Sequence, residues 1–124
     1  MTGSLSPGLA VRTRELATLL VGWPSVTGSA DEAAFARRLA WLLAAWPYFR
    51  HHPENLVLVP VPGGPHRRQN LLALVRGSGR RTVALAGHFD VVPVDNYGDL
   101  APLAGKPEAL REGLLRRLRA GAGM

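Results

Sequence analysis

Residues 82–93 read Thr-Val-Ala-Leu-Ala-Gly-His-Phe-Asp-Val-Val-Pro, an apolar run that ends in a histidine and an aspartate. A short apolar run of this kind, bounded by turn-forming residues, is typical of a buried strand. His88 and Asp90 follow the run directly, and side chains two positions apart in a strand lie on the same face. The sequence therefore predicts a strand over 82–86 that presents these two side chains together.

A histidine and a carboxylate in this arrangement can work as a metal-binding pair. One imidazole nitrogen binds the metal, while the carboxylate accepts a hydrogen bond from the other nitrogen and fixes the tautomer. Ligand sites in open α/β sheets also collect at strand ends. On His88 and Asp90 alone, the simpler interpretation is a surface turn that happens to hold both residues.

Two further strands are predicted upstream. The segments 56–61 and 70–75 are rich in valine and leucine. Residues 77–80 read Gly-Ser-Gly-Arg, and a loop this short predicts an antiparallel hairpin between the second strand and the strand at 82–86.

Helices are predicted before the strands. Leucines at helical spacing indicate a first helix over 9–21, ended by Gly22 and Pro24. Residues 1–8 are expected to form a flexible leader.

A second helix follows the Pro-Ser-Val-Thr-Gly turn at 24–28. Ser29 and Glu32 form the pattern of a capping box, which predicts a helix from that point to about Ala45. Pro47 is expected to stop it, and a loop is predicted over 48–55.

After the motif at 87–93, a single helix is predicted. A loop is expected up to Pro102, then a helix over 108–118, and no regular structure over 120–124. The tryptophans, Trp41 among them, are interpreted as core and helix-packing residues and not as a stacking platform. The resulting fold class is α/β: two N-terminal helices, then a β-sheet with flanking helices.

The motif at 87–93 resembles the first metal-binding motif of the aminoacylase and carboxypeptidase-G family of two-zinc metallopeptidases. The turn at 24–28 and the strand at 70–75 resemble the corresponding parts of that family in order and spacing, so the resemblance covers about residues 9–103. Residues 46–49 and 96–100 look most like the branch labelled arginine-utilisation protein.

The resemblance implies a role for each residue of the pair. His88 matches the family's first zinc ligand, and Asp90 matches the carboxylate that orients it, which makes Asp90 the catalytic-site residue carried over. It also implies that residues 9–124 are the N-terminal portion of a metallohydrolase catalytic domain, an incomplete phosphorylase/hydrolase-like architecture. The complete family enzyme holds two zinc ions and acts on a small peptide or acyl-amino-acid substrate.

The remaining ligands of that family match no position here. The family uses a bridging aspartate, a Glu-Glu pair with the general base, a further acidic ligand and a distal histidine. The acids that follow Asp90 do not lie in the glycine-rich, aspartate-centred motif: Asp95, Asp99, Glu108 and Glu112. The other histidines precede the motif and are interpreted as solvated: His51, His52 and His66.

Composition limits the function classes. The chain has 124 residues and no cysteine, which excludes disulfides and thiolate metal sites and suits a cytoplasmic protein. The net charge of +6 invites a nucleic-acid interpretation, but the arginine pairs are scattered over separate segments, so no nucleic-acid partner is predicted. No membrane partner is predicted either, because the apolar stretch 16–23 is too short to span a bilayer.

Two hypotheses from different classes follow. In the first, the chain is the N-terminal part of a zinc-dependent hydrolase of amide bonds, inactive by itself. In the second, it is a non-catalytic, truncated remnant or a partner-binding module.

Overall fold

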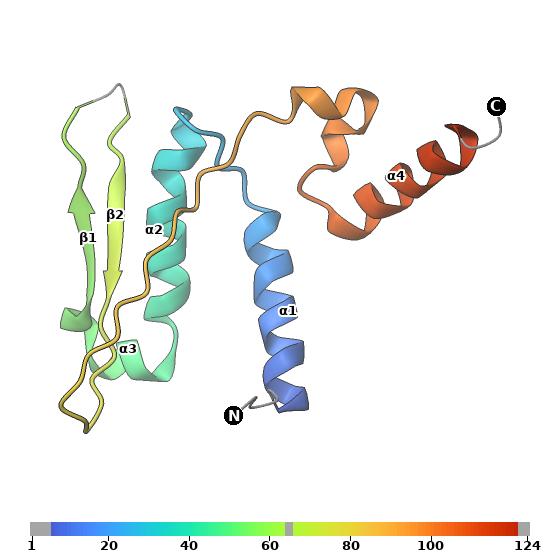
Figure 1. Ribbon diagram of the computed structural model, residues 1–124. Helices are drawn as coiled ribbons and strands as arrows, with labels where there is room; N and C mark the ends of the chain where they lie inside the picture. Colours follow the sequence, from blue (N-terminus) through green and yellow to red (C-terminus); the bar gives the residue numbers. More distant parts are fainter. Residues whose placement is uncertain (1–5, 64–65, 122–124) are drawn as a thin grey trace. The chain divides into compact units, whose positions relative to one another are not determined.

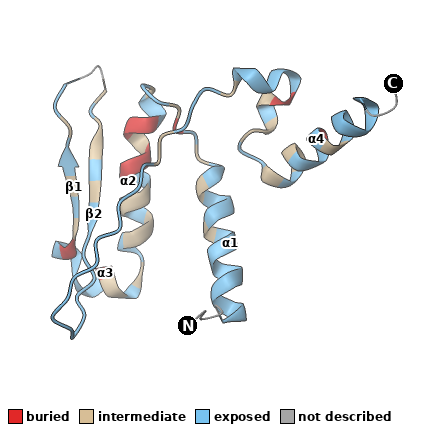
Figure 2. Cartoon of the chain, in the orientation of Figure 1, coloured by how far each residue is buried: buried red, intermediate tan, exposed pale blue. Residues whose placement is uncertain are grey.

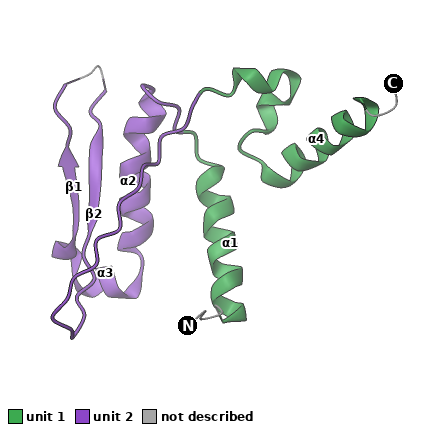
Figure 3. Ribbon diagram, in the orientation of Figure 1, with its two compact units in different colours: residues 1–24, 93–124 green, residues 25–92 purple. Residues whose placement is uncertain are grey.

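The computed structural model describes residues 6–63 and 66–121. The fold is α/β, as the sequence predicts (Figure 1). The chain divides into two compact units, one formed by residues 25–92 and the other by residues 1–24 with 93–124 (Figure 3). The elements in chain order are α1 (Pro7–Val21), α2 (Ala30–Ala44), α3 (Pro47–His51), η1 (Pro53–Asn55), β1 (Leu56–Pro60), β2 (Gln69–Ala73), η2 (Asp95–Leu103) and α4 (Pro107–Gly121).

Helix α2 begins where the capping residues predict. The Ser29 hydroxyl accepts a hydrogen bond from the backbone N–H of Glu32 at 3.2 Å, and this satisfies one free donor of the first turn. The Glu32 carboxylate does not close the box on Ser29. It accepts the backbone N–H of Gly28 at 2.6 Å instead, so the helix is tied to the turn that precedes it.

The predicted loop over 48–55 is wrong, because this stretch forms the short helices α3 and η1. Pro47 ends α2, but it also occupies the first turn of α3, where a missing N–H costs nothing. The Asn55 amide donates to the Tyr48 hydroxyl at 3.1 Å and links the two short helices.

The first two predicted strands are confirmed as β1 and β2, with bounds shifted by one or two residues. They pair antiparallel with each other, from Leu56 opposite Ala73 to Pro60 opposite Gln69. The predicted hairpin with residues 82–86 is wrong.

Residues 82–86 form no strand in the described part of the chain. Val83 is 82% exposed and Leu85 is 94% exposed, so no neighbouring strand or helix covers this segment. A strand needs a partner for its backbone groups, and its apolar composition alone does not supply one.

Helix α2 packs on one face of the sheet and forms the core of the 25–92 unit (Figure 2). The buried apolar residues of this unit are Ala33, Phe35, Ala36 and Phe49. The opposite sheet face leaves Val57, Val59 and Leu72 exposed. Trp41, predicted in the core, is 86% exposed.

Helix α1, in the other unit, begins at Pro7, two residues before its predicted start. The Ser6 hydroxyl caps it by accepting the N–H of Leu9 at 3.4 Å. Pro7 and Gly8, which were assigned to the predicted leader, are therefore helical, while residues 1–5 lie outside the described part. None of the described helices is both long and apolar enough to cross a membrane.

The predicted loop before the last helix is also wrong, because η2 occupies it as two helical turns joined at a kink. The kink falls at Gly98, with φ of 59° and ψ of −128°, a conformation that residues with a Cβ avoid. Buried Leu100 packs against Gly113 of α4. The last helix is longer than predicted and includes Ala120 and Gly121, while 122–124 lie outside the described part.

Candidate functional site

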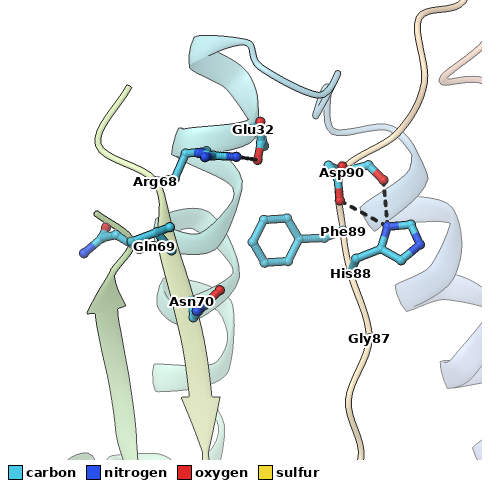
Figure 4. A pocket seen from close by; sticks show the side chains of 9 residues that line it. Glu32, Arg68, Gln69, Asn70, Gly87, His88, Phe89 and Asp90 are labelled. Carbon is cyan, nitrogen blue, oxygen red and sulfur yellow. Dashed lines mark hydrogen bonds and ion pairs between the residues drawn. The ribbon is translucent and has the colours of Figure 1, made fainter. Parts of the chain in front are cut away.

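His88 and Asp90 lie together as predicted, although no strand positions them. His88 Nδ1 is 3.1 Å from Asp90 Oδ1 and 3.0 Å from the Asp90 backbone oxygen (Figure 4). Both neighbours are hydrogen-bond acceptors, so the neutral ring is satisfied when Nδ1 carries the proton. In that tautomer Nε2 keeps its lone pair, which a metal ion requires. The His88 side chain is 84% exposed and therefore accessible to a ligand.

Asp90 is held by a second partner on its other oxygen. The Thr27 hydroxyl donates to Asp90 Oδ2 at 2.9 Å, across 63 positions of sequence. This hydrogen bond is the largest cause that lowers the pKa of Asp90 below its ordinary value, and the hydrogen bond and charge of His88 act in the same direction. The carboxylate is thus kept ionised while it accepts from both neighbours.

The site segment is anchored to the rest of its unit through Phe89. The Phe89 ring stacks on Phe35 of α2, with ring centroids 4.9 Å apart and an interplanar angle of 13°. Its backbone oxygen accepts a hydrogen bond from the Ser25 hydroxyl at 2.7 Å, and Ser25 is almost fully buried. Figure 4 shows Phe89 directed toward α2 and β2 and the His88 imidazole on the other side of the segment.

A backbone bridge completes the anchoring. Val26 and Val91 form a parallel β-bridge. The N–H of Thr27 donates to the Val91 oxygen at 2.9 Å, and the N–H of Val91 donates to the Ser25 oxygen at 3.0 Å. The site segment is therefore fixed by the turn before α2 and not by the sheet.

A cavity of about 270 Å³ lies beside the pair. Its lining residues come from α2, from β2 and the residues that join it to β1, and from the site segment: Glu32, Val61, Arg68, Gln69, Asn70, Gly87, His88, Phe89 and Asp90 (Figure 4). Arg68 and Glu32 face each other in it at 3.5 Å, and the Glu32 side chain is only 11% exposed. This part of the lining is therefore polar and carries a compensated pair of charges.

The other histidines do not join the site. His51 Nδ1 lies 2.7 Å from the Pro47 oxygen, and His52 Nδ1 lies 3.5 Å from Glu54. Within residues 6–63 and 66–121, no group of three or more His, Asp or Glu side chains could hold a metal ion. The donor set described here fits one zinc ligand with its orienting carboxylate, and not a complete two-zinc centre.

Sequence reasoning missed Thr27 and Ser25 as site residues. Both lie in the Pro-Ser-Val-Thr-Gly turn, which the sequence marks as a turn only. The one available signal was that this turn and the motif at 87–93 both belong to the family resemblance, although their distance in sequence gave no indication of contact.

Comparison with known proteins identifies two curated relatives, both from Bacillus subtilis (strain 168). The protein named Uncharacterized protein YqjN is 40% identical over 103 residues, which is 82% of this chain and 18% of YqjN. Protein RocB is 31% identical over 105 residues, which is 83% of this chain and 19% of RocB. The chain thus spans less than a fifth of the length of these relatives. No protein-family model and no solved structure matches it.

Proposed function

We propose that this chain is the N-terminal part of a zinc-dependent hydrolase that acts on amide bonds in peptides or acyl-amino acids. The observation that carries the proposal is the His88–Asp90 pair, with Nδ1 on the carboxylate and Nε2 left for a metal ion. The family resemblance around 87–93 supports the same role for both residues.

Within this proposal each residue has a distinct task. His88 holds the metal through Nε2, and Asp90 fixes the ring and raises its basicity. Phe89 keeps the segment against α2 through its stack on Phe35. A zinc ion held by His88 would supply Lewis-acid chemistry, polarising a substrate carbonyl and lowering the pKa of a water.

The proposal assigns the remaining ligands and the general base to a longer polypeptide. A catalytic zinc site uses about three protein ligands plus a water, and His88 supplies one. The relatives YqjN and RocB are more than five times as long as the matched stretch, which leaves room for these groups. The match to RocB also supports the resemblance to the arginine-utilisation branch. The proposed substrates are still the peptides or acyl-amino acids of the aminoacylase and carboxypeptidase-G family.

The test is a zinc titration of the ¹⁵N-labelled chain, observed at the imidazole nitrogens. We expect weak binding that shifts His88 Nε2 before any nitrogen of His51 or His66. The His88→Ala variant should lose this early response, and the histidines outside the site serve as internal controls. Equal responses of all the histidines would contradict the proposal.

A turnover assay complements the titration. With added zinc, the 124-residue chain should not hydrolyse acylated amino acids or dipeptides, whereas a version extended with the downstream sequence should. In the extended version, Asp90→Ala should lower activity or metal affinity about 10- to 100-fold. Zinc-dependent turnover by the short chain, abolished by His88→Ala, would show that other residues or a second copy complete the site.

The second candidate is a non-catalytic, partner-binding module. It is compatible with the finding that, among the described residues, no group of three or more His, Asp or Glu side chains could hold a metal ion. An extended version that binds no zinc and hydrolyses no amide would support this candidate over the first.

A further inference from the structure

One side chain of the turn before α2, that of Thr27, forms a hydrogen bond with the side chain of a site residue, the Asp90 carboxylate. Ser25 bonds the Phe89 backbone oxygen, and the Val26–Val91 bridge joins main chain to main chain. Thr27 alone bonds the carboxylate that faces His88. Its hydroxyl therefore acts on the orientation of Asp90, while its neighbours act on the position of the backbone.

We propose that Thr27 is a positioning residue for the His88–Asp90 pair, and that its hydroxyl favours the tautomer in which Nδ1 of His88 carries the proton. With Oδ2 fixed by Thr27 at 2.9 Å, the carboxylate plane is set so that Oδ1 lies 3.1 Å from His88 Nδ1. This inference deepens the proposed function and rests on it for the identity of the ligand that Nε2 would bind.

The hydroxyl has two acceptors but only one proton to donate. The Val91 oxygen lies 3.1 Å from Thr27 Oγ1, farther than the Asp90 oxygen at 2.9 Å. The Val91 oxygen also already accepts the N–H of Thr27, whereas a carboxylate forms the stronger, charge-assisted hydrogen bond. The proton therefore goes to Asp90.

The Asp90 side chain is 34% exposed, and among the described side-chain hydrogen bonds the one from Thr27 is made to Oδ2. Without Thr27, the carboxylate can rotate toward water and its bond to Nδ1 weakens. The backbone oxygen of Asp90 remains near Nδ1 and keeps part of the preference. The expected effect is consequently a shift in tautomer population and not a complete reversal.

The turn is itself held from the helix side. The buried Glu32 carboxylate accepts the Gly28 N–H at 2.6 Å, directly after Thr27 in the chain. Gly28 has φ of 78°, in the left-handed region, so the backbone turns sharply there. The backbone that carries Thr27 is thus restrained by the hydrogen bond between Gly28 and Glu32.

The experiment measures the tautomer of His88 by long-range ¹H–¹⁵N correlation at about pH 8, where imidazoles are neutral. We expect the Nδ1–H form to dominate in the wild-type chain. Thr27→Val, which keeps the shape and removes the hydroxyl, should lower the ratio of Nδ1–H to Nε2–H about two- to tenfold, the range that the loss of one net hydrogen bond produces. Thr27→Ser should keep the wild-type ratio.

Two controls separate positioning from general damage. Thr13→Val makes the same substitution at an exposed helix position, where the hydroxyl bonds only the Leu9 oxygen, and should leave His88 unchanged. His51, whose Nδ1 faces the Pro47 oxygen, should keep its Nδ1–H tautomer in every variant.

An unchanged His88 ratio in a folded Thr27→Val variant would overturn the inference. If that variant does not fold, Thr27→Ser decides, since a ratio that falls in the folded serine variant would equally refute it. A wild-type chain in which Nε2–H dominates would refute it without any variant. If the tautomer depends on Thr27 but zinc does not perturb Nε2, the proposed function fails while the positioning role stands.

Discussion

Truncation of Phe89 to alanine should destabilise the 25–92 unit by about 2–3 kcal/mol. Removal of a fully buried phenylalanine costs about 3–5 kcal/mol, and Phe89 is only half-buried, which places it at or below the low end of that range. The stack on Phe35, at 4.9 Å and 13°, accounts for about 0.5–1.5 kcal/mol of the loss.

The assay is urea unfolding followed at the amide signals of α2, so that the 25–92 unit is read by itself. At a denaturant slope of about 1 kcal/mol per M, Phe89→Ala should lower the midpoint by about 2–3 M. Leu85→Ala is the matched control, because Leu85 lies in the same segment but is 94% exposed; its effect should stay within about 0.5 kcal/mol. Equal midpoint shifts for the two variants would refute the reasoning.

Three further predictions concern the turn, the carboxylate and the charge. Gly28→Ala should destabilise the 25–92 unit by about 1–2 kcal/mol, because φ at Gly28 is 78°, a conformation that a residue with a Cβ avoids. The control is Gly8→Ala on α1, where the added Cβ meets open space and no loss of stability is expected. Urea midpoints of the two units measure both effects, and equal losses of stability would contradict the prediction. The pKa of Asp90 is lowered in the folded chain, so the stability that its ionised form contributes is present above about pH 4 and disappears as the pH falls through the lowered pKa. A carboxyl ¹³C titration should give an Asp90 midpoint below about 3.9, and a midpoint above that value would refute the assignment. Finally, the chain should bind DNA weakly despite its +6 charge, and sub-micromolar affinity at physiological salt with a steep salt dependence in fluorescence anisotropy would prove this wrong.

Five elements predicted from local signals are present in the structure: α1, α2, β1, β2 and α4. Ser29 specifies the start of α2 through a hydrogen bond three residues away, and the sequence shows both partners side by side. The strands β1 and β2 were predicted from composition, and each finds its partner a few residues along the chain. Interactions between residues that are close in sequence can be predicted because both partners lie in the same short stretch of the chain.

The predictions that failed depended on partners that a local window does not contain. Residues 82–86 have the composition of a strand, but strand formation needs a neighbouring backbone, and the described part of the chain provides none. The opposite error occurred at Pro47, where a residue used as a stop signal also starts a helix.

At the site, the pairing of His88 with Asp90 was predicted from their spacing in an expected strand and from the family resemblance, and the two side chains do lie together although the segment forms no strand. The support of this pair by Thr27 was not predicted, because that hydrogen bond joins residues 63 positions apart. Nothing in the composition or periodicity of either segment indicates that contact.

The open segment at 82–86 has a consequence for how this chain behaves at high concentration. An uncharged run of Thr-Val-Ala-Leu-Ala with exposed side chains is a template for cross-β association between molecules. Arg80 and Arg81 stand immediately before it, where paired positive charges act as gatekeepers by repelling a second copy stacked in register. Such repulsion weakens as ionic strength rises, so salt, which screens these arginines, should promote self-association of the chain.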